Sequence, residues 1–246
     1  MIERENMEHF LEDNIEKCIK ALLEKFLKWP NNFFTESDAH SYLYYYFFRS
    51  GAKALKQFYS TNDSEKQKKQ KTVLIHREYP TSFRYQKETM QLDEKKGGRG
   101  HYDLVVLDPE FVKAHELKQI IAKNYKTDCV KNEMSLLASI EFKLIVKPLD
   151  RNVQDQIEKD FQKLEWAVEK NQAKQSYMII FNRYREEKRY KDKVIKQKKL
   201  HPKIKGIYLE SIVNPQRLCE IIYLNEWKYK LRFNRRCLVT EVKGPT

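Results

Sequence analysis

Two stretches, Gly100-His-Tyr-Asp-Leu-Val-Val-Leu107 and Ser139-Ile-Glu-Phe-Lys-Leu144, decide the fold of this chain. Each contains an apolar run of the length and composition of a buried strand. Alternate residues of a strand face the same side, so Glu141 and Lys143 share one face. A buried glutamate and a buried lysine are costly without partners. If the two strands are neighbours, Asp103 at the start of the first apolar run converges with Glu141.

The rest of the pattern places these strands in an α/β domain with a mixed sheet. Apolar residues at helical spacing predict helices at 5–29, from 35 to about 58, 109–126, 152–169 and 184–199. Strands are predicted at 72–79, 101–107, 136–146, 176–181, 206–209 and 228–233. We expect Pro80 to stop the first strand, the first two strands to pair antiparallel, and 59–71 to be a solvated connection. No linker divides the chain, so 1–246 is predicted to be a single domain.

The composition favours a polyanionic partner. The chain has 246 residues, 41% of them hydrophobic, which is enough for a sizeable core and argues against wholesale disorder. Lys and Arg number 48 against 35 Asp and Glu, giving a net charge of +13. Nucleic acid and an anionic membrane surface both fit this excess. A well-charged surface that serves only solubility is the plainer interpretation.

Cysteine usage and hydropathy predict a cytoplasmic protein. The four cysteines are scattered without a CxxC pair, as in reduced intracellular proteins: Cys18, Cys129, Cys219 and Cys237. The acidic N-terminal stretch lacks the pattern of a signal peptide. The longest run without Asp, Glu, Lys or Arg, residues 39–48, is too short to span a bilayer. No membrane association is expected.

Asp103, Glu141 and Lys143 together have the chemistry of a metal-dependent phosphodiesterase. Two converging carboxylates repel each other unless a cation lies between them, and hard oxygen ligands select Mg²⁺ or Mn²⁺. Such an ion polarises a phosphate oxygen and activates water, while a nearby ammonium offsets charge in the transition state. An ExK sequence alone is more often an edge-strand charge pair. The aspartate before one apolar strand, the ExK in a second strand and the helix after it favour the metal site.

These motifs, with Asp160-Phe-Gln-Lys-Leu164 on the following helix, resemble the PD-(D/E)XK nuclease superfamily. The resemblance implies a restriction-endonuclease-like αβββαβ core over about 33–183, with an extra N-terminal helix and a basic C-terminal extension, 184–246. It implies that Asp103 and Glu141 are the metal ligands and that Lys143 positions the water. The spacing between the two carboxylates exceeds the short hairpin common in the family, so 109–132 is interpreted as an insertion.

Several further residues are candidates for the site. Glu36 fits the acidic position that the family often has on the helix before the first strand, and equally fits a favourable charge in a first helical turn. Glu78, His101 and Lys163 are additional candidates for the site, each of which also suits an ordinary surface position. Phosphate contacts are expected from a set of basic residues: Arg99, Arg183, Arg185, Lys188, Arg189, Lys196 and Lys198.

The sequence therefore predicts a Mg²⁺- or Mn²⁺-dependent nuclease, with DNA as the expected substrate and endonucleolytic cleavage as the expected mode. Cutting both strands of a duplex would favour a homodimer. The alternative is a non-catalytic nucleic-acid-binding protein that retains the nuclease fold. The intact Asp, Glu and Lys set favours the enzyme.

Overall fold

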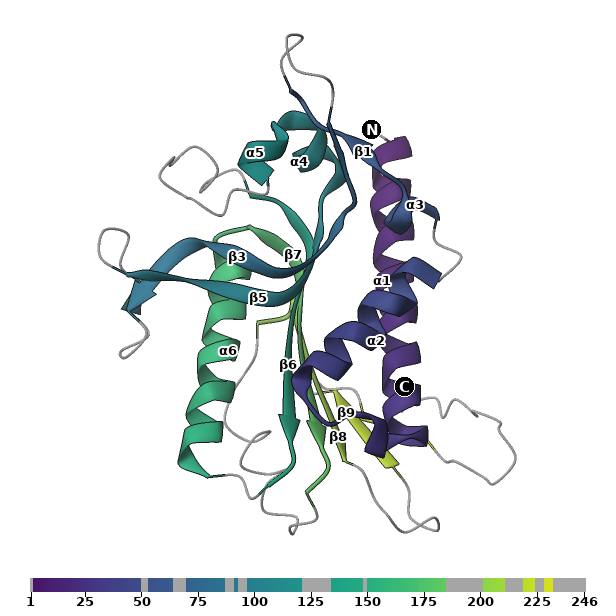
Figure 1. Ribbon diagram of the computed structural model, residues 1–246, viewed down its shortest axis with the longest axis vertical. Coiled ribbons are helices and arrows are strands. Elements are labelled where there is room, and N and C mark those ends of the chain that lie inside the picture. The colour runs from purple at the N-terminus through teal and green to yellow at the C-terminus, as the bar shows by residue number, and fades with distance from the viewer. Residues whose placement is uncertain are drawn as a thin grey trace.

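A mixed sheet with helices on both faces forms the centre of the molecule (Figure 1). The computed structural model describes residues 2–49, 53–63, 70–86, 91–92, 97–120, 134–147, 150–184, 201–210, 219–223 and 228–231. The strands of the main sheet are β3 (Ile75–Gln86), β4 (Gln91–Leu92), β5 (Gly98–Leu107), β6 (Leu136–Ile145), β7 (Ala173–Asn182), β8 (Ile204–Glu210), β9 (Cys219–Tyr223) and β10 (Lys228–Leu231). These eight strands have the spatial order β10-β9-β8-β7-β6-β5-β3-β4. Strand β7 is parallel to β6 and β8, and the other neighbouring pairs are antiparallel.

Helices cover both faces of this sheet (Figure 1). The helices are α1 (Ile2–Lys28), the 3-10 turn η1 (Pro30–Asn32), α2 (Glu36–Arg49), α3 (Lys53–Lys56), α4 (Pro109–Ala114), α5 (Leu117–Ile120) and α6 (Arg151–Glu169). Helices α1 and α2 lie on one face, and α6 lies on the other (Figure 1). Helix α6 connects the parallel strands β6 and β7, as a crossover between parallel strands must. The prediction of an α/β fold with a mixed sheet is confirmed.

The amphipathic periodicity predicted the long helices correctly. Most of the apolar positions that define the helical spacing are buried: Leu11, Ile15, Ile19, Leu22, Leu23 and Phe26 in α1, and Ile157, Phe161, Leu164 and Val168 in α6. Near the start of α1 the pattern is less complete, because Met7 is partly buried and Phe10 is 50% exposed. The predicted start of α2 is also present, because the Asp38 carboxylate accepts a hydrogen bond from the Thr35 backbone N–H at 2.8 Å. Helix α2 ends at Arg49, earlier than predicted, and α3 follows as a separate short helix.

Pro80 does not stop the first strand, contrary to the prediction. Strand β3 continues through it to Gln86, with an irregular register between Pro80 and Arg84. Strand β4 pairs only with Tyr85 and Gln86, so at Pro80 the described part of the sheet places only β5 beside β3. A proline is tolerated where its missing N–H would have faced no partner strand.

The glycine-rich segment before Asp103 belongs to a strand, which begins three residues before the predicted start at 101. Strand β5 begins at Gly98, and Arg99 lies opposite Arg84 of β3. A Cβ atom at Gly100 would clash with the phenol of Tyr85, which explains a glycine at this point inside a strand. Strand β5 is therefore long enough to carry Asp103 in its interior.

Smaller differences concern the connections. The solvated connection 59–71 contains two short strands, β1 (Tyr59–Ser60) and β2 (Lys71–Thr72), which pair with each other. The predicted helix 109–126 is observed as α4 and α5, and 121–133 lie outside the described residues. Strand β9 was not predicted. The predicted helix 184–199 falls, from 185 on, outside the described residues.

None of the described helices combines the length and the apolar character that crossing a bilayer requires.

Candidate functional site

The candidate site lies where strand β5 separates from β6. The last residues that pair across these strands are Leu104 and Ile140. In an antiparallel ladder every second N–H points toward the same neighbour, so the N–H of Phe142 points into the gap that β5 leaves. The Asp103 carboxylate fills this position, because its Oδ2 accepts a hydrogen bond from the Phe142 N–H at 2.7 Å. A side chain thus replaces the missing strand backbone and satisfies a donor that would otherwise be unpaired.

Glu36 occupies the equivalent position one step further along β6. Its Oε1 accepts from the N–H of Leu144 at 3.3 Å and lies 3.3 Å from the Nζ of Lys143. Glu36 is the first residue of α2, where an acidic side chain is favourable. Glu36 thus lies in the first helical turn and contacts the ExK lysine, and its role in catalysis stays a prediction.

Glu141 is buried and paired with a lysine from α6. Glu141 is 1% exposed, and its Oε1 lies 2.7 Å from the Nζ of Lys163. Lys163 also lies 3.3 Å from Asp160 and donates to the backbone oxygen of His101 at 2.8 Å. Burial raises the pKa of the Glu141 carboxyl well above its usual range, while Lys163 opposes this shift. Burial lowers the pKa of Lys163, but the neighbouring carboxylates outweigh it, so the pKa is raised and the ammonium form is favoured.

The Lys143 ammonium pairs with carboxylates from helices on both faces of the sheet. Its Nζ lies 3.3 Å from Glu36 on α2 and 3.5 Å from Asp160 on α6. Burial lowers the pKa of Lys143, but Asp160 and Glu36 outweigh this and raise it above its usual value. The side chain therefore carries a positive charge fixed beside the gap between β5 and β6.

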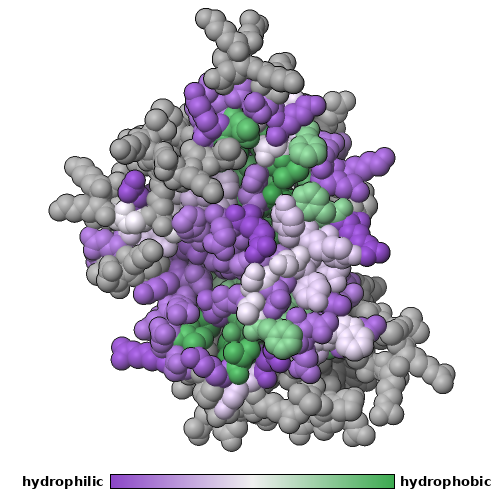
Figure 2. Space-filling view, in the orientation of Figure 1, coloured by the Kyte–Doolittle hydropathy of each residue, from purple (hydrophilic) through white to green (hydrophobic). Residues whose placement is uncertain are grey.

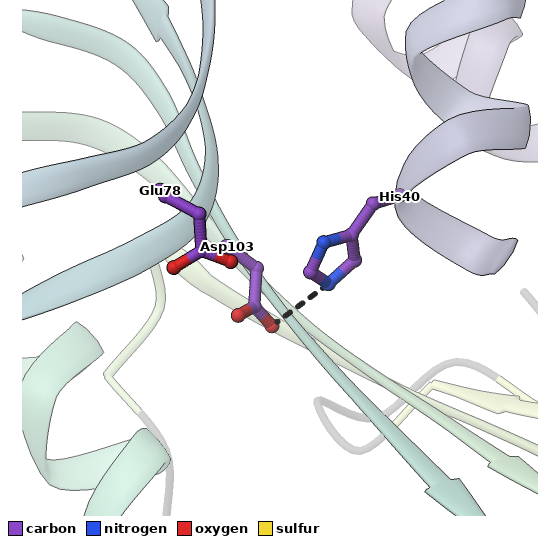
Figure 3. A group of neighbouring side chains, drawn as sticks. All are labelled: His40, Glu78 and Asp103. Carbon is purple, nitrogen blue, oxygen red and sulfur yellow. Dashed lines mark ion pairs between the residues drawn. The ribbon is translucent and has the colours of Figure 1, made fainter. Parts of the chain in front are cut away.

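Asp103 faces His40 of α2 across the same gap. His40 Nε2 lies 3.5 Å from Asp103 Oδ2, and Figure 3 shows the two side chains pointing toward each other. The His40 ring packs against the ring of Phe142, with centroids 5.0 Å apart. Burial raises the pKa of Asp103, but His40, the Phe142 N–H and Lys163 outweigh it, so the pKa is lowered. Asp103 is therefore a carboxylate at neutral pH.

Glu78 completes a group that can hold a metal ion. One ligand atom each from His40, Glu78 and Asp103 can be chosen so that all lie within 4.8 Å of one another, and the three side chains converge in Figure 3. Glu78 has φ of 50°, a left-handed conformation that costs a non-glycine residue roughly 1–3 kcal/mol. Strain of this kind persists where the surrounding structure requires it, frequently at functional sites.

The structure brings most of the predicted site residues together. Asp103, Glu141, Lys143 and Glu36 all lie at the gap between β5 and β6, and Lys163 joins them from α6. The His101 side chain is exposed and contributes its backbone oxygen to Lys163.

The predicted phosphate contacts are only partly within the described residues. The guanidinium of Arg183 donates to the backbone oxygen of Phe33 at 2.6 Å and to the Oδ1 of Asn31 at 3.3 Å, so it fixes the segment before α2. Arg99 lies on β5. The other predicted contacts lie outside the described residues: Arg185, Lys188, Arg189, Lys196 and Lys198. Their role in nucleic-acid binding stays a prediction.

The sequence did not single out His40, and it indicated Asp160 only as part of the motif on the following helix, without a role at the site. His40 follows Glu36 by four residues on the same helix, and Asp160 precedes Lys163 by three residues on α6. Both spacings place the paired side chains on one face of a helix. This spacing was a usable signal, but it does not say which helix face approaches which strand.

Hydrophilic side chains cover the middle of the face on which β3 and β5 lie in front (Figure 2). Apolar side chains form separate patches toward the two ends of this face.

At the gap between β5 and β6, buried carboxylates and two lysine ammonium groups lie close together. His40, Glu78 and Asp103 can hold a metal ion there. Comparison of the chain with protein-family models, with curated proteins and with solved structures finds no match.

Proposed function

We propose that this chain is a metal-dependent nuclease of the PD-(D/E)XK type, which hydrolyses phosphodiester bonds of nucleic acid, with DNA as the expected substrate. The observation that carries the proposal is the meeting of Asp103, Glu141 and Lys143 at the gap between β5 and β6. Carboxylates for a divalent cation and an ammonium for a phosphate are the groups that this reaction needs.

The order of elements supports the same proposal. Helix α2 is followed by β3, β5 and β6, which are consecutive neighbours in the sheet, and then by α6 and the parallel strand β7. With the short elements α3, β1, β2, β4, α4 and α5 left aside, this order is compatible with the αβββαβ core that the resemblance implies. Helix α1 and strands β8 to β10 are additions to it at the two ends.

The residues of the chain have distinct roles in this proposal. A divalent cation held by Asp103 with neighbouring carboxylates would polarise a phosphate oxygen and lower the pKa of a bound water. The Lys143 ammonium, fixed by Glu36 and Asp160, offsets the charge that builds on the phosphate. Lys163 holds Glu141 in place and limits the negative charge at the site.

Replacing Asp103 by asparagine tests the proposal. The variant keeps an acceptor for the Phe142 N–H but loses the charge that binds a cation, so metal-dependent cleavage should fall by about 10²-fold or more. Cleavage of linear, nicked and branched DNA, and of RNA, is measured with Mg²⁺, with Mn²⁺ and with a chelator.

The matched control is Asp155→Asn, an exposed aspartate on α6. It should cleave like the wild type. If the wild type binds DNA without cutting any of the substrates, the chain is a non-catalytic nucleic-acid-binding protein. Equal metal-dependent cleavage by the wild type and Asp103→Asn would place the reaction elsewhere.

Nucleic-acid affinity is expected to fall steeply with salt, because basic side chains that neutralise phosphates release counterions. Replacing Lys188, Arg189, Lys196 and Lys198 together by glutamine should flatten a plot of log affinity against log salt. If all four contact duplex phosphates, the slope should change by roughly 3 to 4. Fluorescence anisotropy of a labelled duplex measures the slope. An unchanged slope would assign this basic run to solubility alone.

A further inference from the structure

We propose that the metal ion of this site is held by His40, Glu78 and Asp103, with Glu141 as an outer neighbour, and that Mn²⁺ is preferred over Mg²⁺. The inference rests on the proposed function for the use of the ion, but its test measures metal binding alone.

The geometry of the three side chains fits a single ion. Their ligand atoms lie within 4.8 Å of one another. Around one ion with bonds of about 2.1 Å, adjacent ligand atoms lie roughly 3 Å apart and opposite ones about 4.2 Å apart. His40 Nε2 and Asp103 Oδ2, 3.5 Å apart, already lie in this range, and side-chain movement on the order of 1 Å would complete the site. His40 comes from α2, Glu78 from β3 and Asp103 from β5, so elements distant in sequence supply the ligands (Figure 3).

His40 supplies the observation that points to a ligand. The residue is 5% exposed, and neither ring nitrogen has a hydrogen-bond partner among the described residues. Its Nε2 faces the Asp103 carboxylate at 3.5 Å, and the Phe142 ring fixes the plane of the imidazole. Buried polar groups are normally satisfied, and a cation between His40 and Asp103 would satisfy this one.

Glu141 is less suitable as a direct ligand. Its Oε1 lies 2.7 Å from Lys163, whose ammonium also contacts Asp160 and the His101 backbone oxygen. A cation bound directly to Glu141 would have to approach this fixed positive charge. Glu141 therefore contributes to the field around the ion, while His40 and Glu78 take the ligand positions beside Asp103.

The imidazole decides the preferred metal. Mg²⁺ strongly favours oxygen ligands and retains its waters, whereas Mn²⁺ accepts a nitrogen together with carboxylates. A site of one imidazole and two carboxylates is therefore expected to bind Mn²⁺ roughly tenfold or more tightly than Mg²⁺.

The test is Mn²⁺ binding to the full chain without nucleic acid. We expect one Mn²⁺ per chain by calorimetry, displaced only by a large excess of Mg²⁺, and nitrogen coupling from the imidazole in pulsed electron paramagnetic resonance of the bound Mn²⁺. His40→Gln should lose the nitrogen coupling and most of the preference for Mn²⁺. Glu78→Gln should weaken the binding of both metals, and it should weaken Mn²⁺ binding more than Glu141→Gln does.

The matched control is His9→Gln, which removes an exposed histidine of α1. It should keep the affinity and the nitrogen coupling. Bound Mn²⁺ without nitrogen coupling, equal wild-type affinities for the two metals, or loss of binding in Glu141→Gln but not in Glu78→Gln would each overturn the inference. If His40→Gln fails to fold, the nitrogen coupling of Mn²⁺ bound to the wild type and the metal affinity of Glu78→Gln still test the inference. Mn²⁺ binding of the expected kind without cleavage would refute only the nuclease.

Discussion

Replacing Lys143 by methionine is expected to lower the rate of metal-dependent cleavage by about 10²–10³-fold while the chain stays folded and binds DNA. Methionine keeps most of the side-chain volume inside β6 but removes the ammonium. The two carboxylates that lose this partner are Asp160 and Glu36. Asp160 still has the Lys163 ammonium 3.3 Å away, and the Glu36 side chain is 38% exposed, so water can solvate its charge. The charge of Lys143 matters most when negative charge builds on the phosphate, so kcat should fall far more than KM rises.

Single-turnover cleavage and DNA affinity, measured on the same preparations, separate these effects. Lys147→Met is the matched control, since this lysine follows β6 with its side chain 67% exposed. It should retain wild-type cleavage. A Lys143→Met variant that is folded and cuts at the wild-type rate would remove Lys143 from the machinery and with it the ExK basis of the proposal.

Replacing Lys163 by methionine is expected to destabilise the fold by about 3–5 kcal/mol, because it leaves Glu141 buried without its cation. The side chains of this pair are 7% and 2% exposed, so water cannot take the place of the missing partner. Replacing both residues, as Glu141→Leu with Lys163→Met, should recover most of the loss, since an apolar pair often substitutes for a buried ion pair. Denaturant unfolding of the four proteins gives the coupling energy of the pair.

An exposed pair at the same distance provides the control. Lys113 lies 2.7 Å from Glu110, with side chains 48% and 45% exposed, and Lys113→Met should cost at most about 1 kcal/mol. If Lys163→Met costs no more than Lys113→Met, the burial of Glu141 is not maintained by Lys163.

The loss in Lys163→Met should also depend on pH. Burial is the largest influence on Glu141 and raises its pKa, and Lys163 is the first of the groups that lower it. In the variant, the folded-state pKa therefore lies well above the unfolded value of about 4.3. A group of this kind stabilises the fold below its unfolded pKa and loses that contribution as pH rises through the folded pKa. The deficit relative to wild type should grow from acidic to neutral pH, and a constant deficit would contradict this account.

The strands that carry the chemistry could be predicted from short windows of sequence. The apolar runs around Asp103 and Glu141 specify buried strands because only a core position repays so many adjacent apolar side chains. Alternation placed Glu141 and Lys143 on one face, and the helical spacing of apolar residues predicted α1 and α6 with their buried faces. These are local properties, which a short window of sequence contains.

The partners of the charged groups, in contrast, depend on how distant elements pack together. The separation of β5 from β6 after Leu104 leaves the N–H of Phe142 to Asp103, and no local pattern encodes where two strands diverge. His40 and Lys163 reach the site from helices on opposite faces of the sheet, at large distances along the chain. Partner choice among buried charges depends on which elements pack together, because a charge inside the core is stable only beside the group that compensates it.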